Sequence, residues 1–195
     1  RVLMVDLDPQ GSLTGSFELF RQGEPVRGID WDNTIGPVLT GEITDARQVV
    51  HQTHWPTIDI VPASVDVYDA EMLLAVETAR SGLQDSPFWK RLDTALRPLD
   101  EYDFVLLDSA PALNLAAINA VVAADGLVIP VPPRNLDLEA AVKFAKVVHS
   151  WTERLPGFNS RRRWLRLLLT QLQKGSLSDQ THSLLASRFF GSLIF

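Results

Sequence analysis

Two carboxylates stand two residues apart near the start of the chain, in the segment Asp6-Leu7-Asp8-Pro9-Gln10-Gly11. Residues i and i+2 of an extended chain point to the same side, so Asp6 and Asp8 can act at one place. Carboxylate oxygens suit a hydrated Mg²⁺ or a water that is to be activated, and Gly11 permits close approach of a ligand to the backbone. Asp-Pro and Gly also occur in ordinary turns that end strands, so the spacing alone leaves both interpretations open.

A third acid, Asp108, ends a later apolar run and is followed by Ser109-Ala110-Pro111. Four apolar residues and then an aspartate is the pattern of the acid on the magnesium side of P-loop NTPases. Strands with an acidic end also occur in many unrelated domains. By itself this pattern is therefore compatible with a site or with a plain strand end.

The elements that position these acids can be predicted from hydrophobic periodicity. Short continuous apolar runs bounded by turn residues are typical of strands covered on both faces, and they fall at residues 2–5, 58–61, 104–107, 127–131, 164–169 and 193–195. Helical patterns lie between them, at residues 69–80, 88–96, 113–123, 136–151 and 177–188. This alternation predicts an α/β fold with a mainly parallel sheet and helices on both faces. Ligands of such folds bind at the carboxyl ends of the strands, where the three acids stand.

Composition limits the classes of function. The 195 residues, 46% hydrophobic and 22% charged, are typical of one soluble globular domain. The absence of cysteine excludes disulfides, thiolate metal sites and cysteine nucleophiles. No apolar stretch approaches the roughly 20 residues of a membrane helix. The net charge of −6 argues against binding nucleic acid over the whole surface but permits a local basic patch. The one dense basic run is Arg161-Arg162-Arg163, which either contacts DNA phosphates or keeps an exposed loop soluble; Lys174 is a further candidate.

Taken together, these segments resemble the conserved blocks of ParA-type partition ATPases, in the same order and spacing. VLMVDLDPQGS at residues 2–12 resembles the second block of that family, and YDFVLLDSAP at 102–111 resembles its acidic strand block. IDIVPAS at 58–64 is similar to the strand that ends in a Pro-Ala pair. Residues 119–131 are similar to the helix and strand that follow, and 132–137 resemble the longer, plasmid-borne members. The resemblance covers nearly the whole chain.

The resemblance implies a P-loop NTPase-like fold of the SIMIBI/ParA type, with ATP and Mg²⁺ as cofactors. Asp8 matches the acid that orients or activates the attacking water, and Asp6 matches its companion near the magnesium and the phosphates. Asp108 matches the acid that holds Mg²⁺, largely through water. The remaining positions implied at the nucleotide are Pro132 and Thr170, near the base, and Gly11.

One departure from the family is large. The family's phosphate-binding loop contains Gly-Lys-Thr, and its lysine and backbone N–H groups hold the phosphates. None of the four lysines of this chain (Lys90, Lys143, Lys146 and Lys174) follows a glycine. In the family that loop lies just before the segment that matches residue 1. We therefore expect residues 1–195 to form a single partial ATPase domain, incomplete at both ends, which as given does not bind ATP.

The resemblance also implies a biological role, namely ATP-dependent partitioning of plasmid or chromosomal DNA in the bacterial cytoplasm, in association with the nucleoid. The intact protein would form a homodimer with ATP, bind DNA non-specifically through Arg161, Arg162, Arg163 and Lys174, and hydrolyse ATP when stimulated by a ParB-like centromere-binding protein. Two alternatives remain. One is a MinD-like positioning ATPase, and the other is a non-catalytic DNA- or protein-binding relative that lacks the phosphate loop.

Overall fold

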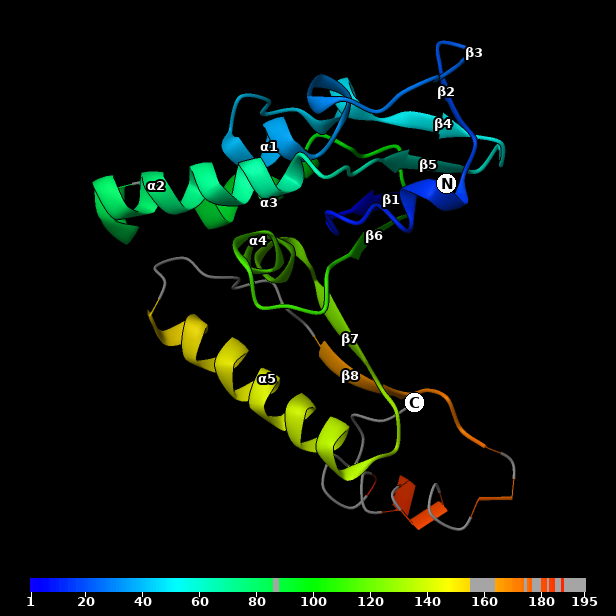
Figure 1. The fold of residues 1–195 in the computed structure, drawn as a ribbon, viewed down its shortest axis with the longest axis vertical. Coiled ribbons are helices and arrows are strands. Elements are labelled where there is room, and N and C mark those ends of the chain that lie inside the picture. Colours follow the sequence, from blue (N-terminus) through cyan, green and yellow to red (C-terminus); the bar gives the residue numbers. More distant parts are fainter. Residues whose placement is uncertain are drawn as a thin grey trace. The chain divides into compact units, whose positions relative to one another are not determined.

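The computed structural model describes residues 1–85, 88–154, 164–173, 175–176, 180–181, 183–184 and 187. Its internal contacts divide the chain into two compact units, Arg1–Ala123 and Ala124–Phe195, which we call unit 1 and unit 2. The strands and helices of both units are labelled in Figure 1. Each unit is described by itself below.

Unit 1 is built on a six-stranded sheet with the order β3-β2-β4-β5-β1-β6. In the middle, β1 runs parallel to both β5 and β6, whereas β2, β3 and β4 extend the sheet in antiparallel fashion. The strands are β1 (Val2–Asp6), β2 (Leu19–Arg21), β3 (Glu24–Pro25), β4 (His51–Thr53), β5 (Ile58–Val61) and β6 (Phe104–Asp108). The carboxyl ends of the three parallel strands therefore lie next to one another, as expected for the α/β fold.

The helices of unit 1 supply its apolar core together with β1 and β5 (Figure 1). Leu3, Ile60, Leu74 and Leu92 are completely buried there. The α-helices are α1 (Gly36–Thr40), α2 (Val67–Asp85), α3 (Arg91–Leu96) and α4 (Leu115–Ala123). Short 3₁₀ turns are η1 (Thr14–Ser16), η2 (Trp31–Asn33), η3 (Ala46–Val49) and η4 (Phe88–Lys90).

Strand β6 corrects one expectation. Its continuous apolar run predicts a strand covered on both faces, but Phe104 is 66% exposed and Leu106 is 53% exposed. Along β6, exposed residues alternate with half-buried ones. The reason is its place in the sheet, because among the residues that the structure describes β6 ends the sheet and pairs only with β1. One backbone edge of this strand is consequently unpaired, and one of its apolar faces is exposed as well.

The carboxylate of Asp59, on β5, links the amino ends of the three parallel strands. Asp59 is buried, and it accepts hydrogen bonds from the Arg1 guanidinium and from the Tyr102 hydroxyl, the latter at 2.8 Å. The Arg1 guanidinium also lies 5.1 Å from the centre of the Tyr102 ring. Burial and the neighbouring Asp59 carboxylate raise the pKa of the Tyr102 hydroxyl, so it stays protonated and keeps donating.

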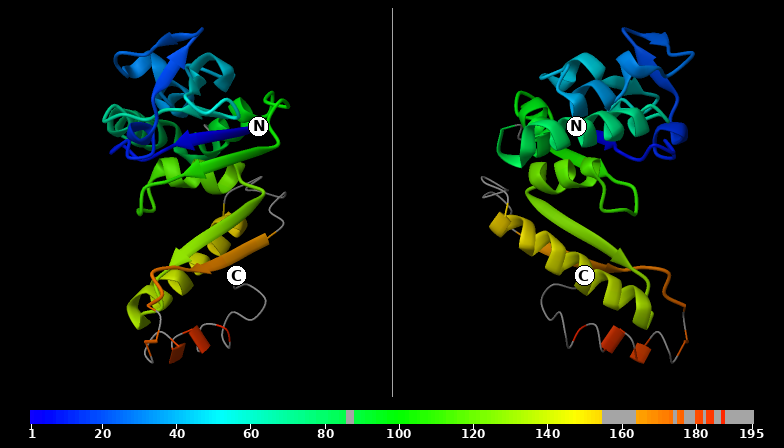
Figure 2. Two further views of the ribbon diagram at one scale, coloured as in Figure 1. Left: turned by 90° about the vertical axis from the view of Figure 1, so that its right-hand side faces the viewer. Right: turned by 60° about the vertical axis from the view of Figure 1, so that its left-hand side comes forward.

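Unit 2 contains a parallel pair of strands, β7 (Gly126–Val131) and β8 (Trp164–Leu169), with α5 (Asn135–Arg154) between them in sequence. Figure 2 shows the two strands running in the same direction. Val131, Ala141 and Leu167 form a small core, against which Ile129 and Leu138 pack. A methyl group at Gly126 would collide with the Trp164 ring, so a larger residue there would force that ring to move. In the part of the chain that the structure describes, no helix is long and apolar enough to cross a membrane.

The amphipathicity of α2 allows a matched test of this packing. Leu74 is completely buried, whereas its neighbour Leu73 is 47% exposed. We expect Leu74→Ala to lower the free energy of unfolding by about 2–5 kcal/mol, because it removes buried methyl groups and leaves a cavity. Leu73→Ala should change it by only about 0.5 kcal/mol, as is usual for surface positions. Urea denaturation of both variants is the measurement, and equal losses would contradict the orientation of α2.

Candidate functional site

The acids of unit 1 come together at the carboxyl ends of the parallel strands, which we call the carboxyl edge. Asp6 and Asp108 are register partners at the ends of β1 and β6. The Leu7 N–H donates to the Asp108 carbonyl oxygen at 2.8 Å, which continues the pairing one step beyond β1. Asp8 follows on the same segment, so parallel pairing alone places these carboxylates at one edge.

Asp6 is completely buried, and its side chain faces its own loop. One carboxylate oxygen accepts a hydrogen bond from the Asp8 N–H at 3.0 Å. The other accepts from the Thr14 N–H at 2.9 Å and from the Thr14 hydroxyl at 2.7 Å. Buried carboxylates need such donors in place of water. The structure thus assigns both Asp6 oxygens to the segment from residue 8 to residue 14.

Asp8 differs from Asp6 in its surroundings. It is half-buried, and its carboxylate accepts one hydrogen bond, from the Gln10 N–H at 2.9 Å. Its backbone is fixed at the same time by the bond from its own N–H to Asp6. Asp8 therefore combines a fixed backbone with a carboxylate that solvent can reach, which is what a group acting on water requires.

Asp108 lies on the open face of β6. Burial of part of its carboxyl group raises the pKa of Asp108, and the carboxylates of Asp6 and Asp8 raise it further. This cluster of negative charge would be relieved by a cation. Among the described residues, however, no three His, Cys, Asp or Glu side chains come close enough to hold a metal ion directly. Direct ligation by three side chains is therefore not the arrangement seen here.

The loop between β1 and η1 depends on Gly11 and Thr14. Gly11 has a φ of +61°, and a Cβ there would lie 3.1 Å from the Ala63 carbonyl oxygen. A glycine is consequently needed for the backbone itself, and its close approach is to residue 63. The Thr14 hydroxyl accepts a hydrogen bond from the Ala63 N–H at 2.9 Å. The sequence analysis missed Thr14, because a threonine eight residues after an aspartate belongs to no periodic pattern.

The segment that follows Asp108 is anchored by a residue that sequence reasoning also missed. The Glu71 carboxylate of α2 accepts hydrogen bonds from the N–H groups of Leu115 and Ala116, at 3.0 and 2.7 Å. Asn114 caps the same helix, since its side-chain oxygen accepts from the Ala117 N–H at 2.8 Å. An acid at the positive end of α4 is favourable. No local sequence signal reveals Glu71, because the pairing spans 44 residues.

The remaining candidate residues belong to unit 2 or lie outside the described residues. Pro132 follows β7 and Thr170 follows β8, and the Thr170 N–H donates to the Val131 carbonyl oxygen at 3.0 Å. Parallel pairing thus brings these two predicted positions to the same end of the unit 2 sheet. The basic candidates Arg161, Arg162, Arg163 and Lys174 lie outside the residues that the structure describes.

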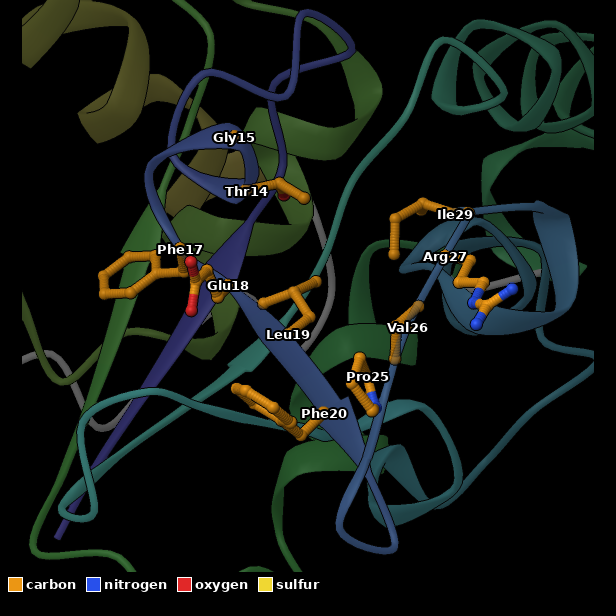
Figure 3. Close-up of a pocket in the computed structure, with 11 residues that line it drawn as sticks. Thr14, Gly15, Phe17, Glu18, Leu19, Phe20, Pro25, Val26, Arg27 and Ile29 are labelled. Atoms are coloured by element: carbon orange, nitrogen blue, oxygen red, sulfur yellow. The ribbon is translucent and has the colours of Figure 1, made fainter.

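A cavity of about 550 Å³ lies in unit 1 beside the loop that joins β1 to η1, between η1 and the β2–β3 hairpin (Figure 3). Its walls are largely apolar, and Glu18 and Arg27 are the charged side chains among them. Thr14 contributes to one wall. The acids of the strand edge do not line this cavity, so it is separate from the candidate site.

Several known proteins resemble this chain in sequence. The family model AAA_31, described as an AAA domain, matches residues 1–160. The probable plasmid-partitioning protein ParA of Thermus thermophilus is 33% identical over 184 residues, covering 92% of this chain and 51% of that protein. Protein SopA of Escherichia coli K12 is 29% identical over 182 residues, covering 92% of this chain and 45% of SopA.

A solved structure extends the comparison to the fold. Cobyrinic acid a,c-diamide synthase from Mycobacterium smegmatis, with bound ADP and magnesium, superposes with a TM-score of 0.74 at 23% identity, covering 96% of this chain and 69% of the synthase. This similarity shows a shared P-loop NTPase-like fold. The chain spans about half the length of the curated relatives that it matches. Since the family model covers residues 1–160, the chain belongs to this AAA domain family, that of the ParA-type partition ATPases.

Proposed function

We propose that the protein containing this chain is an ATPase that partitions plasmid or chromosomal DNA in bacteria. The observation that carries the proposal is the convergence of Asp6, Asp8 and Asp108 at the carboxyl edge of the parallel strands, in a chain of the ParA-type family. The relative named as a probable plasmid-partitioning protein supports the role. The alternative of a non-catalytic relative is separated from it by the ATP titration below, whereas a MinD-like positioning ATPase would share the same ATP chemistry.

The chemistry assigned to this edge is hydrolysis of the terminal phosphate of ATP. The half-buried Asp8 carboxylate orients a water and accepts its proton as that water attacks the γ-phosphorus, while the bond from this phosphorus to the β–γ bridging oxygen breaks and ADP leaves. When bound, Mg²⁺ would neutralise phosphate charge. Asp108 would hold it largely through water, since burial and the neighbouring Asp6 and Asp8 carboxylates raise the pKa of Asp108 and a cation would favour its ionised form. Gly11, Pro132 and Thr170 remain proposed nucleotide contacts.

The phosphates themselves need a further element. This chain has no Gly-Lys-Ser/Thr sequence to hold them. In the described structure β6 has an open edge and exposes the apolar side chains of Phe104 and Leu106. We propose that one more parallel strand, leading into a lysine-containing phosphate loop, pairs with β6. That strand would belong to the same protein, outside these 195 residues.

Assembly is proposed from the family together with one surface feature of α2, and DNA binding from the family together with a basic run of the sequence. Tyr68, Met72 and Val76 recur at every fourth residue of α2 and are exposed, so they form an apolar stripe suited to a homodimer contact. The Gln10 side chain reaches the Tyr68 hydroxyl at 3.3 Å, which connects this stripe to the candidate site.

The basic run Arg161-Arg162-Arg163, with Lys174, is the proposed contact for non-specific DNA. Phosphate contacts of this kind weaken steeply with salt. A ParB-like centromere-binding protein would stimulate hydrolysis and release the DNA. In this account the protein works in the cytoplasm, on the nucleoid.

Nucleotide binding is the first test. Mg²⁺·ATP is titrated into the 195-residue chain and into the protein translated from its own start codon. We expect only the longer protein to bind, because it would supply the phosphate loop. If both proteins are folded and neither binds ATP, the ATPase proposal fails and the non-catalytic alternative takes its place.

The role of Asp8 is tested in the longer protein by Asp8→Asn, which keeps an acceptor for the Gln10 N–H but cannot take a proton. We expect ATP hydrolysis to fall by about 10²–10⁴-fold while ATP binding is kept. The control is Asp69→Asn, the same change at an exposed acid in the first turn of α2. Wild-type turnover in Asp8→Asn would remove Asp8 from the mechanism.

The charge at Asp108 predicts a stability effect that depends on pH. The pKa of Asp108 is higher in the folded state than its ordinary 3.8, so the folded state binds the carboxyl proton of Asp108 more tightly than the unfolded state does. Ionisation of Asp108 therefore destabilises the folded state. Asp108→Asn should therefore be more stable than the wild type near neutral pH, with the difference shrinking as pH falls toward 3.8. Thermal midpoints between pH 4 and 7 measure this. A difference that is absent, or that stays constant with pH, would refute the electrostatic account.

A further inference from the structure

Thr14 connects three segments of unit 1 through one side chain. Its hydroxyl donates to the Asp6 carboxylate at 2.7 Å, at the end of β1. The same oxygen accepts from the Ala63 N–H at 2.9 Å, just after β5. Its own N–H also donates to Asp6, at 2.9 Å. With Thr14 only 8% exposed, these bonds are shielded from competition by water.

Asp6 and Thr14 together account for the position of Asp8. The oxygen of Asp6 that is not bonded to Thr14 accepts from the Asp8 N–H. The Asp6 carboxylate is therefore the common acceptor that ties Asp8 at one end of the loop to Thr14 at the other. Being completely buried and occupied by these donors, it has no surface to offer a cation or a water.

We propose that Asp6 and Thr14 are positioning residues that hold the Asp8 carboxylate in place for hydrolysis through the linked hydrogen bonds Ala63–Thr14–Asp6–Asp8. The inference rests on the proposed ATPase function for its kinetic consequence, whereas the linkage itself stands on the geometry. It gives Asp6 an indirect role in place of the role beside the magnesium and the phosphates, largely through water, that the family resemblance implied.

The hydroxyl is the part of Thr14 that this role requires. Thr14→Val keeps the shape but removes a donor to Asp6 and the acceptor for the Ala63 N–H, which is buried. Leaving a buried donor unpaired is unfavourable, so the loop should shift to find another partner. Thr14→Ser keeps the hydroxyl and should preserve the linkage.

The chain offers a closely matched control in Thr53. Thr53 is 7% exposed, and its hydroxyl likewise accepts from a backbone N–H, that of Trp55 at 3.1 Å. It donates to the Ile58 carbonyl oxygen at 2.7 Å, with the Trp55 carbonyl oxygen as a further acceptor at 3.2 Å. It lies near the amino end of β5, whereas Thr14 lies near the carboxyl end. Thr53→Val thus removes comparable bonds without touching the Asp8 loop.

The test measures kcat and the Kd for ATP of the longer protein carrying each substitution, well below every thermal midpoint. Thr14→Val should lower kcat roughly tenfold or more, since misplacing a catalytic group by about 1 Å can cost 10²-fold, and should leave the Kd within about threefold. Thr14→Ser and Thr53→Val should retain at least about half of the wild-type kcat, because neither change should displace the Asp8 carboxylate. Thr14→Ala replaces Thr14→Val if the latter does not fold.

Several outcomes would overturn the proposal. These are wild-type kcat in the variants that lack the Thr14 hydroxyl, an equal loss in Thr53→Val, or no rescue by serine. If the wild-type protein itself does not hydrolyse ATP, the proposed function fails, and amide hydrogen exchange without nucleotide decides the linkage. Exchange of the Asp8 N–H should then rise roughly tenfold in Thr14→Val but not in Thr53→Val; unchanged exchange would refute the linkage.

Discussion

The burial of the Asp6 carboxylate is the constraint on which the candidate site depends. A carboxylate away from water is tolerated only where donors replace its hydration, and here they come from Asp8 and Thr14. The loop must fold back onto the end of β1 to supply them. Thr14 then carries the constraint to Ala63, beyond the end of β5. At the other end of the same strands the buried Asp59 carboxylate likewise accepts hydrogen bonds, from Arg1 and Tyr102.

The carboxyl ends of the strands also collect negative charge, which lowers the stability of the folded protein. Register pairing places Asp108 beside Asp6, and Asp8 adds a further negative charge nearby. Burial and this repulsion raise the pKa of Asp108, so its ionised form is unfavourable in the folded protein. A surface designed for stability alone would not collect these acids. Their presence is explained if the edge meets a cation and phosphates.

The sequence was informative about local features. Apolar runs located β1, β5, β6, β7 and β8, and helical periodicity located α2, α4 and α5, because each of these patterns extends over several residues. The antiparallel strands β2, β3 and β4 were not predicted. They have only two or three residues each, too few to show a period. The open face of β6 also escaped prediction, since burial of a strand depends on its neighbours in the sheet.

Asp6 and Asp108 were identified from the sequence because each ends an apolar run, and Asp8 because it lies two residues after Asp6. What each acid does was harder to foresee. The burial of Asp6 depends on Thr14, and the anchoring of the segment after Asp108 depends on Glu71, which lies 44 residues from its partner Leu115. Long-range hydrogen bonds of this kind leave no periodic trace in the sequence. The family resemblance supplied roles for the acids but not the internal bonding of Asp6.

The proposed division of roles is that Asp6 holds the loop in place, whereas Asp8 acts on the attacking water. It is tested most directly by a crystal structure of the longer protein with Mg²⁺ and a non-hydrolysable ATP analogue. The account predicts that Asp6 keeps its bonds to Thr14 and to the Asp8 N–H, while the Asp8 carboxylate faces a water beside the terminal phosphate. An Asp6 carboxylate that leaves Thr14 to contact the magnesium or its water shell would contradict it.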